Sequence, residues 1–448
     1  MCTFEHMKTP FFLLAALALL SACADPVPPY AVMAHRGSTY WAPEETESAW
    51  RWAREMGADY LESDLQCTKD GVILANHDEL LTRTTDIETV FGPEIPATRR
   101  EFYLSLGFAA DDVEKQLQCD AESFIPYIAS SYYYVELLTL DAGSWFNEDR
   151  PAQARAAYVG SQYVSALQDQ IAYAEGRMLR RDSAGRRILP YSLKSECEGK
   201  TLAEIRADAK ENGKYLEFLD YDFSEAYVDD PADIGHRPGI YIEFKEPEVN
   251  PEDMEQRVYD ILDACGWNII TRKPEETAFY KDGLVQVGKT RGKVILQTFS
   301  PASLVRANAV FKGKLPMCFL LWPPCPEEIP GGDLDTVAGF RAILDWAKEN
   351  GATISGPSIS GAPNDYEELN HPWQAKLVKE AGLLNHPYSF DSLEQMEEQT
   401  GRSDGFFTNR SDLTLQYLID KGLRAGKINP SAPSTVPDPV ATLERLGY

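Results

Sequence analysis

The chain has 448 residues, of which 44% are hydrophobic and 25% are charged, a composition that is ordinary for a globular protein and excludes disorder over most of its length. Its 43 basic and 70 acidic residues give a formal net charge of −27. So acidic a chain repels nucleic acid and anionic membranes at long range, and no Lys/Arg-rich run offsets the charge, so neither is an expected partner.

Residues 1–22 form a predicted export signal. Lys8 precedes the apolar run 11–20, which is too short to span a membrane and has the length of the core of a secretory signal. Residues 20–23, LSAC, resemble a bacterial lipobox, which implies that Cys23 is lipidated and becomes the mature N-terminus. The alternative is a plain signal peptide beside an incidental cysteine. We expect an exported protein, periplasmic or on the cell surface, that is held at the membrane only by this lipid.

Residues 23–30 are rich in proline and are interpreted as a short tether before the folded part of the chain, residues 31–448. Once Cys2 is assigned to the signal and Cys23 to the lipid, six cysteines remain. An exported protein can form disulfides, but the sequence does not choose among the many possible pairings. No pair of cysteine and histidine residues has the spacing of a zinc site.

Eight short apolar segments are the predicted strands, and segments with helical spacing lie between them. The strands are 31–34, 60–66, 241–245, 294–299, 317–322, 352–355, 383–388 and 405–408. The main helices are 46–56, 251–265, 301–310, 333–350 and 373–381. Because strands that alternate with helices form a parallel sheet, and eight such strands close a barrel, the expected fold is a (β/α)8 TIM barrel of the α/β class.

Residues 88–238 separate the second and third predicted strands and are far too many for a simple loop. They contain helix-like segments at 150–157, 164–175 and 202–212. We expect an insertion on the catalytic end of the barrel, with one genuine barrel helix near 164–175.

Polar residues directly follow the first predicted strand, where His35, Arg36 and Gly37 stand in sequence. Histidine can give and take protons near neutral pH. Arginine can fork onto phosphate oxygens, and glycine lets the backbone approach a ligand. A surface turn is the alternative for this segment taken alone.

Two acidic residues share one face of the second strand, since Glu62 and Asp64 are two positions apart. Two carboxylates that face a barrel interior repel each other unless a cation joins them, which is the layout of a Ca²⁺ or Mg²⁺ site. The alternative is an edge strand whose acidic face lies in water.

Two later segments return polar side chains to the same region. The Asp70-Gly71 pair predicts a hairpin that brings His77 back over the carboxylates. On the third strand Glu243 and Lys245 share one face, so Glu243 would complete a set of three carboxylates and Lys245 could hold phosphate. The alternative for that strand is a salt-bridged polar face.

In this order the segments resemble the glycerophosphodiester phosphodiesterase family, in particular its periplasmic bacterial branch. The family's His-Arg-Gly, Pro-Glu-Asn-Thr, Glu-x-Asp, hairpin with His-Asp, and Glu-x-Lys motifs correspond to residues 35–37, 43–46, 62–64, 68–78 and 243–245. The chain departs from the family at Glu45, where the family has Asn, and at Asn409, where it often has Asp. These two departures leave the recognition of glycerol open.

The resemblance implies roles for individual residues of the barrel. The metal ligands for one divalent cation, Ca²⁺ or Mg²⁺, are Glu62, Asp64 and Glu243; the catalytic pair is His35 and His77; the phosphate-binding residues are Arg36 and Lys245. Candidates for the wall of the pocket are Glu44, Phe299, Trp322, His386 and Phe390, with core packing as the alternative for the apolar ones.

The activity that the resemblance implies is metal-dependent hydrolysis of glycerophosphodiesters, small-molecule substrates, to glycerol 3-phosphate and an alcohol. The same barrel could instead serve a phospholipase D-like enzyme on intact lipids or a hydrolase of cell-wall glycerol-phosphate polymers. A more remote alternative is a solute-binding lipoprotein without catalysis, which the presence of both His35 and His77 disfavours. The sequence identifies neither protein partners nor the alcohol, and it does not say which histidine is the base.

Overall fold

A computed structural model of the chain describes residues 26–209, 213–245, 249–275 and 277–448. The predicted signal peptide and Cys23 lie outside these residues. Among the helices of the described ranges, none is long and apolar enough to cross a membrane.

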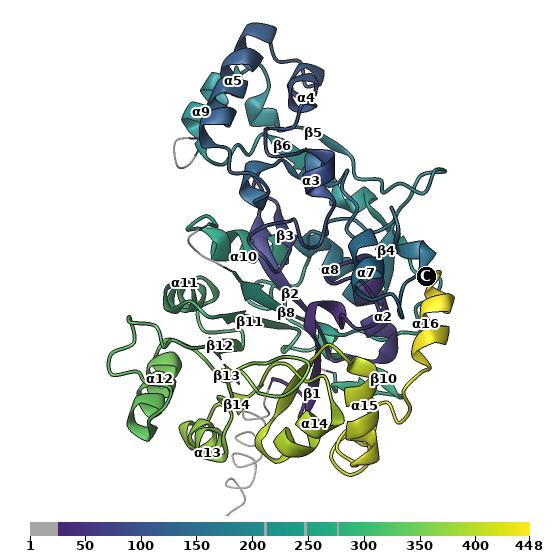
Figure 1. Cartoon of the computed structure of the whole chain (residues 1–448), viewed down its shortest axis with the longest axis vertical. Coiled ribbons are helices and arrows are strands. Elements are labelled where there is room, and N and C mark those ends of the chain that lie inside the picture. Colours follow the sequence, from purple (N-terminus) through teal and green to yellow (C-terminus); the bar gives the residue numbers. More distant parts are fainter. Residues whose placement is uncertain (1–25, 210–212, 246–248, 276) are drawn as a thin grey trace, which may run out of the picture.

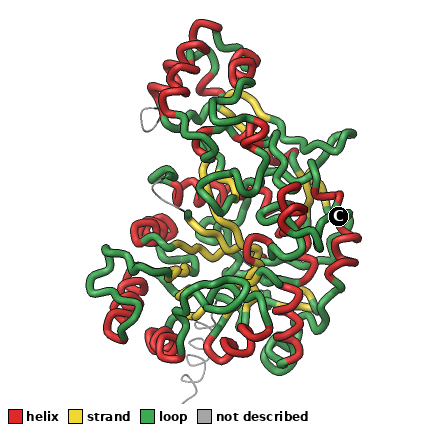
Figure 2. Tube along the Cα trace, viewed as in Figure 1, coloured by secondary structure: helices red, strands yellow, loops and turns green. Residues whose placement is uncertain are grey.

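Eight parallel strands form the centre of the molecule, and helices surround them (Figures 1 and 2). Their order in the sheet is β14-β13-β12-β11-β8-β2-β1-β15. This nearly closed sheet is the TIM barrel that the sequence predicts. The strands are β1 (Ala31–Ala34), β2 (Tyr60–Cys67), β8 (Gly239–Phe244), β11 (Val294–Thr298), β12 (Met317–Leu321), β13 (Ile354–Pro357), β14 (Leu384–Asn385) and β15 (Gly405–Thr408).

Single hydrogen bonds, and not a regular ladder, close the barrel between β14 and β15. The N–H of Phe390 donates to the carbonyl of Phe407 at 2.7 Å, and the N–H of Asp404 donates to the carbonyl of Asn385 at 2.8 Å. β14 is therefore much shorter than the predicted strand 383–388. Pro387 accounts for the difference, because proline has no N–H to donate to a neighbouring strand.

The helices around the barrel begin and end at residues that satisfy the free backbone groups of their first and last turns. In α11 the Ser300 side chain accepts the N–H of Ser303, and Pro301 occupies the first turn. Gly382 ends α13 in the left-handed conformation. The helices are α2 (Glu47–Met56), α8 (Leu167–Ala174), α10 (Met254–Ala264), α11 (Pro301–Phe311), α12 (Val337–Glu349), α13 (Pro372–Ala381), α14 (Leu393–Gln399), α15 (Ser411–Asp420) and α16 (Pro439–Leu446).

The long segment between β2 and β8 returns to the barrel once, through α8. This helix packs against α2 and contacts both β2 and β8, the position of a barrel helix, near the predicted segment 164–175. The rest of the segment holds small helices and two hairpins, and α4, α5 and α9 project away from the barrel (Figure 1). These elements are α3 (Ile87–Val90), α4 (Arg99–Ser105), α5 (Ala110–Ser123), α6 (Tyr134–Leu137), α7 (Ser144–Asp149), α9 (Leu202–Asp208), β4 (Arg177–Leu179) with β7 (Tyr227–Asp229), and β5 (Tyr191–Leu193) with β6 (Leu219–Tyr221).

The predicted helix at 150–157 is wrong. α7 ends at Asp149, and Arg150 has φ −127° and ψ 67°, outside the helical region. Pro151 follows directly, and a proline disfavours the helical conformation of the residue before it.

Residues just before β1 close the amino end of the barrel. Val27 is only 3% exposed and lies in the inner apolar core. The same core contains Tyr60 of β2 and Val285, which belongs to the small hairpin formed by β9 (Tyr280–Lys281) and β10 (Leu284–Val285). A Cβ atom on Gly292 would lie 1.7 Å from the carbonyl oxygen of Pro26, so only glycine allows this close approach. Residues 26–30 therefore pack against the barrel, and only 23–25 of the predicted tether lie outside the described residues.

β12 separates two apolar cores. The side chains of Cys318 and Leu320 belong to the core inside the barrel, whereas those of Phe319 and Leu321 belong to the core between the strands and the helices, which includes Ile343 of α12. This alternation follows from the two-residue period of a strand. The six cysteines of the described residues are free thiols.

Candidate active site

Three carboxylates converge at the carboxyl ends of β2 and β8. Glu62 and Asp64 are two positions apart on β2, and Asp64 lies directly opposite Glu243 in the parallel ladder with β8. All three side chains are buried, and one ligand oxygen from each lies within 4.8 Å of the others. The alternation that pairs Glu62 with Asp64 thus directs both into the barrel, where the register adds Glu243.

The positively charged side chains near these three carboxylates do not fully offset the negative charge of the cluster. Burial, together with the neighbouring Asp64, raises the pKa of Glu62 well above its ordinary value. Burial also raises the pKa of Glu243 to about 8, although Lys245, 3.1 Å away, opposes the shift. Burial acts in the same direction on Asp64, but the nearby His77 and Arg36 hold the pKa of that carboxyl below its usual range.

The donor set of the cluster fits a hard divalent cation. Its ligands are carboxylate oxygens, which Ca²⁺ and Mg²⁺ prefer. The Oδ2 atom of Asp64 is buried and accepts no well-aligned hydrogen bond among the described residues, although it lies 3.1 Å from the Nε of Arg36, and a buried carboxylate oxygen without a hydrogen bond is costly. Glu62, Asp64 and Glu243 would hold the ion.

A tight turn after β1 presents His35 and Arg36 to the cluster. His35–Gly37 form one 3-10 turn, in which Gly37 has φ 85° and a Cβ on it would lie 2.6 Å from the Cβ of Ala49. The N–H of Arg36 donates to Glu62 at 2.7 Å, and the Nε of Arg36 lies 3.1 Å from Asp64. The turn therefore connects the end of β1 to the carboxylates through both backbone and side chain.

His35 is held by a neutral partner. Its Nδ1 lies 2.8 Å from the Oδ1 of Asn409, which follows β15. Burial, and next the charge of Arg36, lowers the pKa of His35 to about 3. An amide oxygen only accepts, so Nδ1 carries the proton and the unprotonated Nε2 is the atom free to take one.

His77 is held by a charged partner. The β2–β3 hairpin, whose second strand is β3 (Ile73–Ala75), pairs Leu65 with Ala75 and returns His77 to the level of Asp64. The Nδ1 of His77 lies 2.5 Å from the Oδ1 of Asp78. Arg83 donates from Nε to the other oxygen of Asp78 at 2.5 Å and holds Glu44 through both of its terminal nitrogens.

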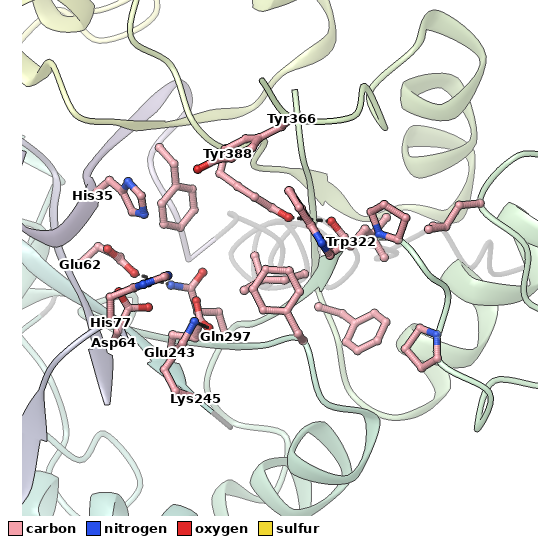
Figure 3. Close-up of a pocket in the computed structure, with 18 of the residues that line it drawn as sticks. His35, Glu62, Asp64, His77, Glu243, Lys245, Gln297, Trp322, Tyr366 and Tyr388 are labelled. Atoms are coloured by element: carbon pink, nitrogen blue, oxygen red, sulfur yellow. Dashed lines mark hydrogen bonds and ion pairs between the residues drawn. The ribbon is translucent and has the colours of Figure 1, made fainter. Parts of the chain in front are cut away.

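The two imidazoles, the three carboxylates and Lys245 lie together at one end of a pocket of about 570 Å³ (Figure 3). Arg36 also lines it, while pairing with Asp64 and Glu44. Lys245 additionally lies 6.0 Å from the centre of the Phe299 ring. The opposite end of the pocket is apolar, and Phe299 and Trp322, both predicted wall residues, belong to it.

Three other predicted wall residues do not line this pocket. Glu44 is turned toward Arg36 and Arg83. His386 is fully buried inside the barrel beside Tyr241, and Phe390 is fully buried against Phe406. The last two follow a strand so short that their side chains pack into the core before the mouth is reached.

The Glu45 departure does not place a charge in the pocket. Glu45 is 4% exposed, and its Oε1 accepts the N–H of Asp64 at 2.7 Å. Burial, and next the neighbouring Asp64, raises its pKa well above the ordinary value. The Glu45 side chain therefore stabilises the backbone of β2 at Asp64 and lies outside the pocket.

Several residues of the site were not among the predicted site residues. Gln297 donates to Glu62 at 2.8 Å. Tyr388 lines the pocket and donates to the carbonyl of Leu321 at 2.7 Å, and Tyr366 lines it beside Trp322. Gln297 lies on β11, two positions before Phe299, so strand alternation could have identified it. The loop position of Tyr366 carries no periodic signal.

Comparison with known proteins gives concordant matches. A sequence model of the Glycerophosphoryl diester phosphodiesterase family matches residues 35–176, a range that includes His35, Glu62, Asp64 and His77. The Glycerophosphodiester phosphodiesterase of Bacillus subtilis (strain 168) is 24% identical over 391 residues, which cover 87% of this chain and 86% of the relative. The human Glycerophosphoinositol inositolphosphodiesterase GDPD2 is 31% identical over 167 residues, 35% of this chain and 25% of the relative.

The fold also has a counterpart among solved structures. A crystal structure from Silicibacter pomeroyi DSS-3, whose protein carries the same family name, superposes with a TM-score of 0.51 at 14% sequence identity. The match covers 88% of this chain and 95% of that chain. At this identity the likeness concerns the barrel fold alone.

Proposed function

Because the chain belongs to the glycerophosphoryl diester phosphodiesterase family and is a glycerophosphodiester phosphodiesterase, we propose that it requires a divalent cation and yields glycerol 3-phosphate and an alcohol. The observation that carries this proposal is the convergence of Glu62, Asp64 and Glu243 within 4.8 Å beside two imidazoles. A bound cation polarises a phosphoryl oxygen and offsets the charge that develops there.

The positively charged side chains of the pocket bind the phosphodiester. Lys245 extends its ammonium group into the same end of the pocket as the carboxylates, and Arg36 lines that end as well. An ammonium group acts as a point charge on phosphate oxygens, and a guanidinium can contact two of them. The pairing of Arg36 with Asp64 keeps its guanidinium fixed before substrate arrives.

The two histidines transfer the protons, and the hydrogen-bond partner of each histidine indicates which one is the base and which one is the acid. His35, half-buried and paired with the neutral Asn409, is unprotonated at Nε2 and takes the proton of the attacking hydroxyl. His77 has the carboxylate of Asp78 behind it, which compensates the positive charge of an imidazolium, so His77 gives its proton to the departing alkoxide. Holding each imidazole by its Nδ1 leaves each Nε2 for this exchange.

The direct test is turnover of glycerophosphocholine by the purified full chain, with product analysis for glycerol 3-phosphate and choline. We expect turnover that a chelator abolishes and that added Ca²⁺ or Mg²⁺ restores. Turnover that persists after complete removal of divalent cations would contradict the metal requirement, and the absence of glycerol 3-phosphate would contradict the proposed products.

Asn409 offers a test of the role of His35. The change Asn409→Asp places a carboxylate 2.8 Å from Nδ1 of His35, which stabilises the imidazolium and raises the pKa of this histidine from about 3. A base with a raised pKa becomes protonated at a higher pH. The acidic limb of the pH profile of kcat/KM is therefore expected to move to higher pH by about one unit or more.

The matched control for Asn409→Asp is Asp412→Asn, which changes one charge in the same segment, where Asp412 pairs with Arg410 and Trp41. The control should leave the acidic limb in place. An unchanged profile in the Asn409→Asp protein would show that His35 is not the group that must be unprotonated for catalysis.

A further inference from the structure

The pocket has two chemically distinct ends. All the charged and imidazole side chains among its described lining residues belong to the catalytic end, from His35 to Lys245. Beyond Phe299 the described lining consists of aliphatic, aromatic and proline side chains, and Figure 3 shows them leading away from the carboxylates. We call this apolar end the apolar arm; it is lined by Phe319, Leu321, Trp322, Pro326, Leu334 and Ile343.

The apolar arm leaves the barrel interior. Phe407 and Leu320 line the pocket from the core inside the barrel. Phe319, Leu334 and Ile343 line it from the core between the strands and the helices. A single pocket bordered by both cores must pass over the end of β12, so the arm is elongated and enters the space between β12 and α12.

We propose that the apolar arm binds one alkyl chain of the substrate, so that the preferred substrates are glycerophosphodiesters that carry one acyl group on glycerol, the lysophospholipid class. This inference rests on the proposed function, since it uses the same catalytic end. A glycerol or choline group placed in the arm would lose its hydration without gaining a partner, whereas an alkyl chain is stabilised by leaving water.

The size of the pocket favours one chain over two. Its volume of about 570 Å³ includes the catalytic end, and cavities in this range accommodate one small ligand. The exposed Trp322 at 42% and the half-buried Tyr366, with ring centres 5.2 Å apart, form an aromatic entrance. Such side chains suit the junction between a polar group and an alkyl chain.

The reaction on such a substrate is an ordinary hydrolysis. Water forms a new P–O bond and gives up a proton, the P–O bond to the head-group alcohol breaks, and the departing alkoxide receives a proton. The products are a monoacylated glycerol phosphate and the free alcohol, so atoms and charge balance without a further reactant.

The test is a chain-length series of monoacyl glycerophosphocholines, each used as monomers below the concentration at which it forms micelles, with glycerophosphocholine as the reference. We expect kcat/KM to rise by up to about fourfold for each methylene that the arm buries, mainly through KM, and then to level off. A flat series, or one that falls with chain length, would overturn the proposal.

A substitution in the arm gives a second, independent comparison. Leu334→Trp fills the arm at a residue that is 6% exposed, and Ile329→Trp introduces the same side chain in the same loop at a buried residue outside the pocket lining. We expect the ratio of kcat/KM for a decanoyl substrate to that for glycerophosphocholine to fall at least tenfold, about the loss of two buried methylenes, in Leu334→Trp only. Equal ratios in the two variants, once thermal melting shows that both are folded, would remove the arm from binding.

Binding without turnover separates this inference from the proposed function. Calorimetric titration with decyl phosphate and with glycerol 3-phosphate reports on the arm even if no diester is cleaved. Tighter binding of decyl phosphate together with absent turnover would contradict the proposed function and support the arm, whereas turnover of glycerophosphocholine with equal affinities for both phosphates would overturn the arm alone.

Discussion

Replacing either His35 or His77 with alanine is expected to lower kcat for glycerophosphocholine by at least ~100-fold, the usual scale for a lost general acid or base. The two variants should differ on a diester with a p-nitrophenol leaving group, which departs without needing a proton. His77→Ala should recover much of its rate on that substrate, because only the proton donor is missing. His35→Ala should stay slow, because the attacking hydroxyl still needs a base.

His371→Ala is the control for these two variants, because His371 is exposed at the start of α13. It should keep wild-type rates on both substrates. If His77→Ala and His35→Ala lose activity equally on the p-nitrophenyl diester, the assignment of acid and base is wrong. Wild-type turnover by both variants would remove the pair from the mechanism.

Glu243→Gln is expected to abolish the effect of divalent cations while leaving the cation-free protein about as stable as the wild type. Burial raises the pKa of Glu243 to about 8, so near neutral pH this carboxyl is largely protonated when no cation is bound, and the amide replaces a group of similar charge. A cation must displace that proton to bind, and the amide cannot offer the same ligand. Activity should fall by about 10³-fold, in line with several kcal/mol of lost charge stabilisation.

Thermal melting with and without Ca²⁺ or Mg²⁺ measures the same effect apart from activity. A cation at 100 times its Kd adds about 2.7 kcal/mol to the stability of the wild-type protein, which raises Tm, and the Glu243→Gln protein should show no such rise. Asp260→Asn, at an exposed acidic residue of α10, should behave like the wild type. A Tm shift in Glu243→Gln equal to that of the wild type would mean that the cation binds elsewhere.

Strand periodicity was sufficient to predict the centre of this site. Because the side chains of a strand alternate, the sequence alone places Glu62 and Asp64 on one face, and the same argument joins Glu243 to Lys245. That these pairs meet depends on the register that puts Asp64 opposite Glu243. The family resemblance, and not the spacing, supplied that part of the prediction.

Contacts between distant loops lay beyond sequence reasoning. In the sequence Asn409 is only a departure from a motif, yet in the structure it holds His35 from the other end of the chain. Arg83 holds both Asp78 and Glu44 through a loop whose conformation has no repeating pattern. In the same way His386, near the end of the predicted strand 383–388, and Phe390, just beyond it, are predicted to line the pocket, but β14 ends early and both side chains lie in the core.

The buried position of Val27 limits where the catalytic end can point. If Cys23 carries a lipid, as the sequence predicts, only residues 24–26 separate that cysteine from Val27, so the two lie at most roughly 14 Å apart. Val27 packs at the amino end of the barrel, opposite the pocket, so this end would rest on the bilayer and the pocket would open toward the aqueous compartment. An enzyme held in this orientation would draw its substrates from solution and not from the leaflet in which it is anchored.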